Sequence, residues 1–477
     1  MAEHLRTIQT GKLYPAFSIP QLYHHLDDTV ETYIAASRLT DLGPKLPTLS
    51  YLASYLQETE NINLSNYLLV MGQHCLLTTG SLLDVLIHQF HCKPTNMFIV
   101  GKNYSNHEPL INKMRIKGIT YQPNHQRLLN GFDAAYSFDI YLLWEQVLAS
   151  INPYSPPEGI IILDDGGFVL KQAENALNQL NIDIPVACVE QTSSGVTIAK
   201  NIPYPTVMLA QSAIKKIIEP KMVAQLLMQQ LPFALAEIKE LQFNEETPIG
   251  IIGFGNVGKA LYYRFKKNRY KNLYVFDKDE NKTAEIPADV ETFDGLLSRA
   301  TLIIGCSGTN AFEAHFHSLL KQQTDKYFIS ISSRTTEFQS ILDYKQSIVP
   351  DDDNADSLSN ITIPTKCGAK LTLIRGGTPF NFNNGPHAIP PLDIDLTRAL
   401  SLVSIHDAYK ITKLKRKLQG SFQLNPKLTW MTVSKWLDNP SRIHLTLSEC
   451  KKYLDVNWII RNSGGKLIAD VKENLID

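Results

Sequence analysis

Residues 248–277 constrain the fold of this 477-residue chain more than any other stretch. A short apolar run ends in Gly253, Gly255 and Gly258, and residues with helical character follow from Val257 to Asn268. A strand, a glycine turn and a helix in this order form a dinucleotide-binding unit. The first glycine permits a tight turn, the second admits a pyrophosphate, and the third lets helix and strand pack closely. The stretch therefore predicts a Rossmann-type nucleotide site.

The residues that follow the turn refine this prediction. Asn256 and Val257 begin the helix, whose unpaired N–H groups are available to phosphate, and 273–276 is the next predicted strand. Asp277 follows that strand at once, where an acid can accept hydrogen bonds from an adenosine ribose. An acid rather than an arginine here favours NAD over NADP. The alternative is a tight turn between strand and helix that binds no ligand.

Composition excludes several classes of protein. The chain is 44% hydrophobic and 19% charged, which is typical of a globular protein, and its length predicts two or three domains. Its 46 basic and 47 acidic residues give a net charge of -1, so we expect no nucleic-acid or membrane partner. Residues 1–20 lack the apolar core of a secretory signal, and no run reaches the length of a membrane span. A cytoplasmic protein is therefore expected.

The six cysteines predict neither disulfides nor a metal site. They are scattered without a CxxC pair, and most lie in apolar runs where a reduced thiol packs as a small hydrophobic group. Cys75, His88, His91 and Cys92 are close in sequence but lack a coherent ligand spacing. We therefore expect no metal.

Apolar strands alternate with helices along most of the chain, which predicts an α/β protein with two Rossmann-like, doubly wound parallel sheets. Asp164 and Asp165 directly follow one predicted strand, at the sheet edge that lines the ligand crevice in such folds. A helix-capping turn is the alternative interpretation of these acids. The predicted strands are 67–71, 97–100, 160–163, 185–189, 273–276, 302–304, 327–331 and 371–374, and the helices are 27–42, 46–57, 79–90, 108–117, 136–150, 169–180, 392–413 and 448–454.

The pattern also predicts how the chain divides into domains. The long helical region 212–241 would bridge two domains, with Pro220 at the first turn of a new helix. Residues 456–460 would form a strand in a small C-terminal module. The expected units are a discontinuous substrate-like domain over 1–214 and 383–412, an NAD-binding Rossmann domain over 215–382, and the C-terminal module over 413–477.

Several stretches, taken in order, resemble the S-adenosylhomocysteine hydrolase family across about residues 65–410. They are ILDDGG (162–167), EQTSSGV (190–196), QSAIKK (211–216), the turn GFGNVG, and the late residues Asn381 and His387. The resemblance implies an oligomeric enzyme of one-carbon metabolism with tightly held NAD. In that family NAD transiently oxidises a ribose 3′-hydroxyl, so that the 5′ substituent of the nucleoside can be eliminated and water added.

The resemblance also assigns roles to individual residues. On the substrate side it implies His74, Asp165, Lys215 and Glu219 as catalytic residues and Thr78, Gln191 and His387 as substrate-binding residues. On the cofactor side it implies that Thr192, Ser193 and Ser194 contact the nicotinamide ribose, Asp277 the adenosine ribose and Asn381 the carboxamide. With Gly253, Gly255, Asn256, Val257 and Gly258, these residues complete the predicted NAD site.

The chain departs from the family at positions that carry chemistry. Gln191 stands where the family has a glutamate, and an amide cannot take a proton from a hydroxyl. Pro220 stands where the family has an asparagine, and Ser333 where it has a histidine. These departures predict a divergent member and argue against ordinary S-adenosylhomocysteine hydrolysis.

Three functional hypotheses follow. The first is an NAD-binding homologue that acts on a nucleoside-like small molecule, with a homo-oligomer as its candidate assembly. The second is a catalytically inactive homologue that binds NAD and serves as a regulatory or partner-binding protein. The third is a dehydrogenase of small acids that shares the nucleotide fold alone. It would need an arginine and a histidine in the cleft, and the sequence offers no convincing pair.

Overall fold

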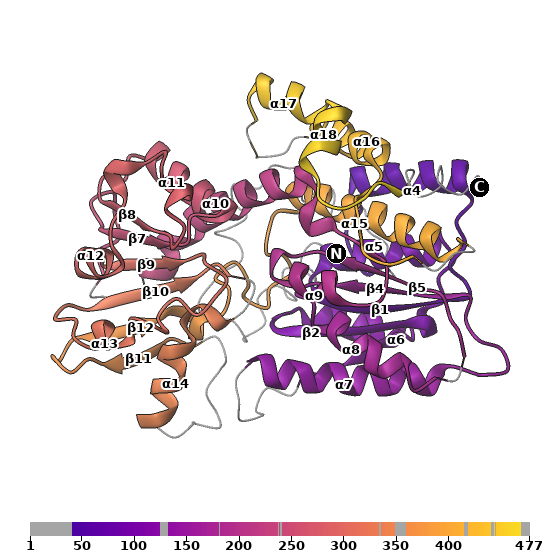
Figure 1. Ribbon diagram of the computed structural model, residues 1–477, viewed down its shortest axis with the longest axis horizontal. Coiled ribbons are helices and arrows are strands. Elements are labelled where there is room, and N and C mark those ends of the chain that lie inside the picture. Colours follow the sequence, from indigo (N-terminus) through magenta and orange to yellow (C-terminus); the bar gives the residue numbers. More distant parts are fainter. Residues whose placement is uncertain are drawn as a thin grey trace, which may run out of the picture.

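Buried apolar strands pair to form one sheet in each of two lobes of the computed structural model (Figure 1). The predicted α/β class with two parallel, Rossmann-like sheets is confirmed. The helix predicted over 27–42 lies almost entirely outside the described residues, as does Ser333. The structure describes residues 41–124, 132–180, 182–236, 238, 241–332, 335–348, 359–414, 418–439, 443 and 445–468.

The first lobe holds a seven-stranded sheet in the order β13-β6-β5-β4-β1-β2-β3, and its recorded strand pairings are parallel. Leu69 and Met71 pack on one face with α4, α5 and α15, whereas Leu68 and Val70 pack on the other with α7 and α8 (Figure 1). The strands are thus buried on both faces, as parallel strands between helices must be. Their bounds are β1 Tyr67–Cys75, β2 Met97–Asn106, β3 Thr120–Gln122, β4 Gly159–Asp164, β5 Val186–Glu190, β6 Thr206–Val207 and β13 Ser421–Phe422.

Helices cover both faces of this sheet. One of them, α15, is buried along nearly its whole length, because it lies between the sheet and an outer layer that contains α4 and α16. The helices of the first lobe are α4 Pro47–Glu60, α5 Leu77–His88, α6 Glu108–Ile116, α7 Phe132–Ser150, α8 Phe168–Leu177, α9 Val196–Asn201 and α15 Pro391–Thr412.

The second lobe holds a six-stranded sheet in the order β11-β12-β10-β9-β7-β8, which is parallel except for the antiparallel pair of β11 and β12. The strands are β7 Ile249–Ile252, β8 Leu273–Phe276, β9 Leu302–Gly305, β10 Lys326–Ser330, β11 Ile361–Pro364 and β12 Lys370–Leu373. Its helices are α11 Asn256–Lys267, α12 Phe293–Arg299, α13 Phe316–Leu319 and α14 Gln339–Ile348.

One helix, α10 (Ala213–Ala236), runs from the first lobe to the second (Figure 1). Ile214, Ile218 and Met222 belong to the core of the first lobe, and Leu231 and Leu235 to the core of the second. The prediction that Pro220 begins a new helix is wrong, because this proline lies inside α10. A single helix is thus anchored in both cores.

The C-terminal residues join the first lobe. β13 pairs with β6 and extends the sheet, and the Trp436 side chain is 1% exposed, with its Nε1 donating a hydrogen bond of 3.0 Å to the carbonyl of Leu392. The strand predicted over 456–460 is wrong: Asp455 caps a helix there by accepting a hydrogen bond from the N–H of Asn457. The helices of this part are α16 Pro426–Leu437, α17 Leu447–Tyr453 and α18 Val456–Asn462. Over the described residues, no helix combines the length and the apolarity that spanning a bilayer requires.

The burial of Trp436 gives a prediction about stability. Trp436→Ala should lower the free energy of unfolding by about 3–5 kcal/mol, because it leaves a large cavity and an unpaired carbonyl at Leu392. Trp430 lies on the same helix but is 36% exposed, so Trp430→Ala should cost less than about 1 kcal/mol. Urea denaturation followed by circular dichroism measures both. Equal losses would show that α16 does not belong to this core.

Candidate functional site

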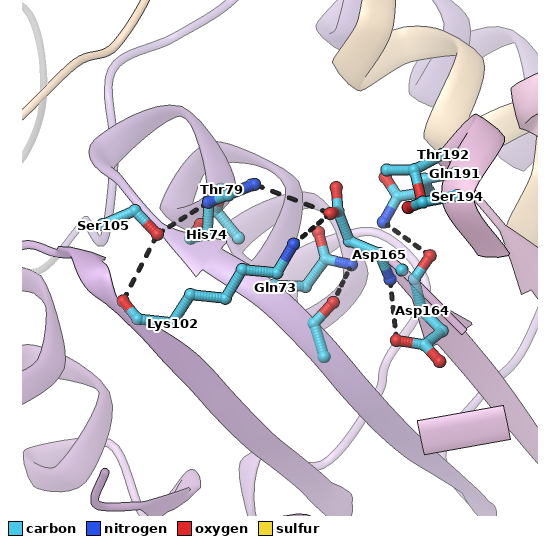
Figure 2. Close-up of polar contacts among 12 residues, drawn as sticks. Gln73, His74, Thr79, Lys102, Ser105, Asp164, Asp165, Gln191, Thr192 and Ser194 are labelled. Atoms are coloured by element: carbon cyan, nitrogen blue, oxygen red, sulfur yellow. Dashed lines mark hydrogen bonds and ion pairs between the residues drawn. The ribbon is translucent and has the colours of Figure 1, made fainter. Parts of the chain in front are cut away.

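The polar residues of the first lobe gather at the carboxyl edge of its sheet. β1 and β2 are longer than the sequence predicts, so His74 lies within β1 and Lys102 within β2. Asp165 follows β4 directly, in the position expected for a residue that lines a crevice. Because β1 lies between β2 and β4, the strand order brings these three side chains together (Figure 2).

Asp165 is the centre of this cluster. Its Oδ1 accepts a charge-assisted hydrogen bond from Lys102 Nζ and lies 3.6 Å from His74 Nε2. On the other side of the imidazole, His74 Nδ1 lies 2.6 Å from the hydroxyl oxygen of Ser105 (Figure 2). The side chains of Lys102, His74 and Asp165 are 2%, 13% and 14% exposed, so these contacts form in a region with little water.

Burial and neighbouring charge set the proton affinities in the cluster. Burial and, after it, the positive charge of Lys102 lower the pKa of His74 to about 4, although Asp165 opposes both. Burial alone would raise the pKa of Asp165, but Lys102 and His74 hold it well below its usual range. Burial alone would lower the pKa of Lys102, which Asp165 instead raises. Near neutral pH the cluster therefore holds a buried ion pair beside a neutral imidazole.

Arg398 of α15 lies close to this cluster. Its charge contributes to the lowered pKa of His74, and its Nε donates a long hydrogen bond of 3.4 Å to Thr78 Oγ1. Arg398 is 7% exposed, and burial lowers its pKa to about 10. Within the part of the chain that the structure describes, no carboxylate lies within ion-pair distance of this guanidinium. The site thus contains a buried cation without a direct counter-ion.

Lys215 and Glu219 lie next to this arginine, on the first turns of α10. Lys215 Nζ donates a hydrogen bond of 2.5 Å to Glu219 Oε1, and Thr397 Oγ1 donates one of 2.9 Å to Glu219 Oε2. Because Thr397 precedes Arg398 on α15, the pair is tied to the helix that carries the guanidinium. The two predicted catalytic residues are therefore brought together as an ion pair.

Gln191 also lies beside Asp165, and its amide is bonded to the protein (Figure 2). Its Nε2 donates a long hydrogen bond of 3.4 Å to the carbonyl of Asp164, and its Oε1 accepts one of 3.2 Å from Ser401. These bonds fix the end of β5 against β4 and α15. The amide thus already has partners on both of its atoms.

The residues predicted to contact a nicotinamide ribose follow Gln191. Thr192 donates from its N–H and its hydroxyl to Glu190 Oε1, at 2.7 and 2.8 Å. The Ser194 hydroxyl lies 3.1 Å from that of Thr192, and Ser193 is exposed. Burial, followed by the charge of Asp164, raises the pKa of Glu190 well above its ordinary value. This loop is therefore organised around a buried carboxyl group of the first lobe.

The segment 379–390, here called the strap, links the carboxyl edges of the two sheets. Pro379 forms a parallel bridge with Ser330, the last residue of β10 in the second lobe. Phe382 then stacks on the His74 ring, with centroids 4.0 Å apart and planes inclined by 12°. Asn381 lies between these two contacts and is partly buried. The same short segment thus contacts the predicted ligand edges of both lobes.

The strap continues into the first lobe past His387. The carbonyl of Pro386 accepts a hydrogen bond of 3.0 Å from the N–H of Leu77. His387 Nδ1 is buried without a hydrogen-bond partner among the described residues. Burial and, after it, His107 lower the pKa of His387 to about 3, so the ring is neutral. Its place on the strap fits either a pocket wall or a stiff hinge.

In the second lobe, the three glycines of the turn occupy three different steric environments. Gly253 has φ of +94°, and a Cβ there would lie 2.7 Å from the backbone of Ser307. A Cβ on Gly258 would lie 2.0 Å from the carbonyl oxygen of Gly253. A Cβ on Gly255 would meet no atom within 4 Å. The first and third glycines are therefore required by the protein itself, whereas the second faces open space beside Asn256 and Val257 at the start of α11.

Asp277 lies at the end of β8, next to this turn. Its Oδ2 accepts a hydrogen bond of 2.6 Å from the N–H of Phe254, and its Oδ1 accepts one of 2.9 Å from the N–H of Asp279. The side chain is 6% exposed. Lys282 Nζ also lies 3.5 Å from each carboxylate oxygen. The two backbone bonds orient the group, and a ribose hydroxyl would compete with the long contact of this lysine.

The sequence analysis missed three residues of the site: Lys102, Arg398 and Phe382. Lys102 lies within β2, two residues past the apolar run 97–100, and a lysine so close to a buried run is a signal that could have been used. Arg398 lies in a helix that is buried along nearly its whole length, and a charge in such a helix also suggests a function. Nothing local distinguishes Phe382 from an ordinary loop residue.

No protein-family model matches the chain. Two curated relatives are 25% identical to it over 335 residues, which cover 68% of this chain: the uncharacterized proteins MT0113 and Rv0104 of Mycobacterium tuberculosis, strains CDC 1551 / Oshkosh and ATCC 25618 / H37Rv. The matched region spans about 60% of the length of these relatives.

Similar solved structures include a D-isomer specific 2-hydroxyacid dehydrogenase from Lactobacillus delbrueckii ssp. bulgaricus in its NAD complexed form. It is 12% identical, with a TM-score of 0.33, over 65% of this chain and 95% of the other. The D-lactate dehydrogenase of Escherichia coli is 14% identical, with a TM-score of 0.30, over 45% of this chain and 75% of the dehydrogenase. A putative D-3-phosphoglycerate dehydrogenase from Ralstonia solanacearum is 13% identical, with a TM-score of 0.32, over 57% of this chain and 82% of that dehydrogenase.

These findings correct the resemblance to S-adenosylhomocysteine hydrolases, which is wrong. The similar structures are dehydrogenases of another Rossmann family. The predicted hydrolase or lyase activity and the predicted link to one-carbon metabolism rested on that resemblance and are not supported. The roles of individual site residues stay predictions, now supported by their geometry alone.

The neutral state of His74 predicts how stability depends on pH. The pKa of this histidine is about 4 in the folded protein and about 6.5 when unfolded, so the unfolded chain binds the proton first as pH falls. The contribution of His74 is complete above about pH 6.5 and is lost as pH falls toward 4. Between pH 7 and pH 5 this loss amounts to about 2 kcal/mol.

Urea denaturation of the wild type and of His74→Gln at both pH values tests this prediction. The wild type should lose about 2 kcal/mol more than the variant between pH 7 and pH 5. Asp164 and Asp395, whose pKa values burial raises to about 6, act in the opposite direction, but they are present in both proteins. An identical pH dependence in the two proteins would contradict the assignment.

Proposed function

We propose that this protein is an NAD-dependent oxidoreductase that acts on a small molecule with a hydroxyl or carbonyl group beside an anionic group. The observation that carries the proposal is the glycine turn, whose second glycine faces open space while the first and third are held by contacts within the protein. That distribution fits a pyrophosphate approaching the backbone at Gly255 and the start of α11. Asp277, oriented by Phe254, fits the ribose end of such a cofactor.

The first lobe supports the position of a substrate. The strap contacts the carboxyl edge of each sheet, so a cofactor on the glycine turn and a substrate at Asp165 would lie on opposite sides of the same segment. Ligands in open α/β sheets bind outside the carboxyl ends of the strands. The region beside the strap is therefore the expected place of reaction.

Arg398 and His74 support the class of substrate. They form the arginine and histidine pair that a dehydrogenase of small acids needs and that the sequence did not reveal. A buried guanidinium without a direct carboxylate partner is suited to an anionic group of the substrate, because desolvation strengthens a charge-assisted hydrogen bond. A carboxylate fits this guanidinium in a bidentate geometry.

The residues of the chain have distinct tasks in this proposal. A bound NAD would supply the hydride acceptor for the carbon that bears the hydroxyl, and the hydroxyl proton would also have to leave. Arg398 would hold the anionic group, and ionised Asp165 would accept a hydrogen bond from the hydroxyl. His74 is neutral, and a neutral imidazole offers one acceptor nitrogen for a proton. Phe382 covers one face of this ring and excludes water from it.

Gly255→Val tests cofactor binding apart from folding. Its Cβ meets no protein atom and its φ of -75° suits any residue, so the melting temperature should change by less than about 2 °C. NAD binding, measured by isothermal titration calorimetry, should weaken at least about 100-fold, because the side chain fills the approach of the pyrophosphate. Gly258→Ala is the contrasting variant and should destabilise the fold itself. Unchanged NAD affinity in Gly255→Val, or no affinity in the wild type, would overturn the proposal.

Arg398→Met tests substrate binding. With NAD and a panel of small 2-hydroxy acids, formation of NADH is followed by its near-ultraviolet absorbance. The variant should lose about 10- to 100-fold in kcat/KM, mainly through KM, because one charge-assisted contact is worth about 1.5–3 kcal/mol. Arg299→Met, an exposed position in the second lobe, should leave kcat/KM unchanged. Binding of NAD without turnover of any panel member would favour the catalytically inactive, NAD-binding alternative.

A further inference from the structure

A groove of about 410 Å³ lies between α10 and α11, on a different face of α11 from the strand against which Gly258 packs. Lys216 and Lys221 of α10 line it together with Lys259, Arg264 and Lys267 of α11. No acidic side chain is among the described residues of its wall. Five basic residues thus share one small concave surface.

Carboxylates outside the groove neutralise two of these five cations. Lys221 pairs with Glu449 of α17, and Lys259 Nζ lies 3.1 Å from Glu285 Oε1. Lys216 donates a hydrogen bond of 2.9 Å to the carbonyl of Asn462, and no carboxylate among the described residues pairs with its charge. The groove therefore keeps a positive charge after these pairs are counted.

Arg264 and Lys267 carry the rest of that charge. Neither forms an ion pair with a carboxylate in the described part of the chain. They are three residues apart on α11, so their like charges lie on the same side of the helix and repel each other. Arg264 Nε is also buried without a hydrogen-bond partner among the described residues. A buried donor without a partner lowers the stability of the fold, and an anion in the groove would remove this cost by accepting a hydrogen bond from Arg264 Nε.

We propose that this groove binds a phosphorylated small molecule. Arginine and lysine are the side chains that recognise phosphate groups, and the volume is in the range of small-molecule sites. Tyr263, which is 50% exposed and lines the groove, offers a ring surface to an apolar part of the ligand. A peptide helix, about 10 Å across, would not fit a space of this size.

The position of the groove gives such a ligand contact with both lobes. Lys216 directly follows Lys215, which pairs with Glu219 at the candidate site, and Asn256 begins the helix of the glycine turn and also lines the groove. The site is separate from the proposed dinucleotide position but adjoins it. A bound phosphate compound would therefore fix α10 against α11.

Inorganic pyrophosphate serves as the probe in isothermal titration calorimetry, with wild-type protein in the absence and presence of saturating NAD. We expect one equivalent to bind in both conditions. The double variant Arg264→Gln/Lys267→Gln should bind pyrophosphate at least 10-fold more weakly than the wild type. The single, exposed change Lys267→Gln should also weaken binding, but less than the double variant does. Lys171→Gln, an exposed position in the first lobe, should bind as the wild type does. Circular dichroism confirms that each variant is folded.

The glycine turn is the competing site for pyrophosphate, and Gly255→Val separates the two. This variant should keep pyrophosphate binding, whatever its effect on NAD, so failure of the proposed cofactor site and failure of the groove give different results. Absence of pyrophosphate binding would overturn the proposal. Loss of pyrophosphate binding in Gly255→Val or on addition of NAD would overturn it as well. Equal pyrophosphate affinity in the double variant and the wild type would also overturn it.

Discussion

The continuity of α10 is the constraint on which the rest of the structure depends. Its first half is packed into the core of the first lobe and its second half into that of the second, so neither lobe can move far without disturbing the apolar contacts of this helix. The strap is a further connection, and it contacts the carboxyl edges of both sheets. Together they hold the glycine turn and the charged cluster in one arrangement.

The candidate site combines charges that would be costly to bury separately. Lys102 and Asp165 stabilise each other's charged forms, and burial together with the charge of Lys102 keeps the neighbouring histidine neutral. Among the described residues Arg398 has no such direct partner, and its charge is balanced through Asp165 and Glu219 at longer range. This imbalance distinguishes the site from an ordinary internal salt bridge, since a buried charge without a direct partner is expensive and is usually associated with a ligand.

Sequence reasoning located much of the site but not its connections. Asp165 was placed correctly at a strand end, because a strand followed by acids and glycines is a local pattern. His74 was singled out through a family resemblance that is wrong, although its position beside Asp165 is a feature of the structure. Lys102 and Arg398 were missed because the residues next to them do not show which groups they meet, and those groups are far away in the sequence. The wrong strand prediction over 456–460 has a related cause. Its apolar residues suggested a strand, whereas a local cap at Asp455 starts a helix there.

The sequence by itself determined the α/β class and the glycine turn. Both follow from local rules, namely the alternation of apolar strands with helices and the space that each glycine must leave around it. The tertiary structure decided which charges meet. Residues 102, 165 and 398 come from three separate elements, and their proximity results from the order of strands in the sheet and the burial of α15 against it. Hydrophobic packing that acts over hundreds of residues sets that proximity, and no short stretch of sequence records it.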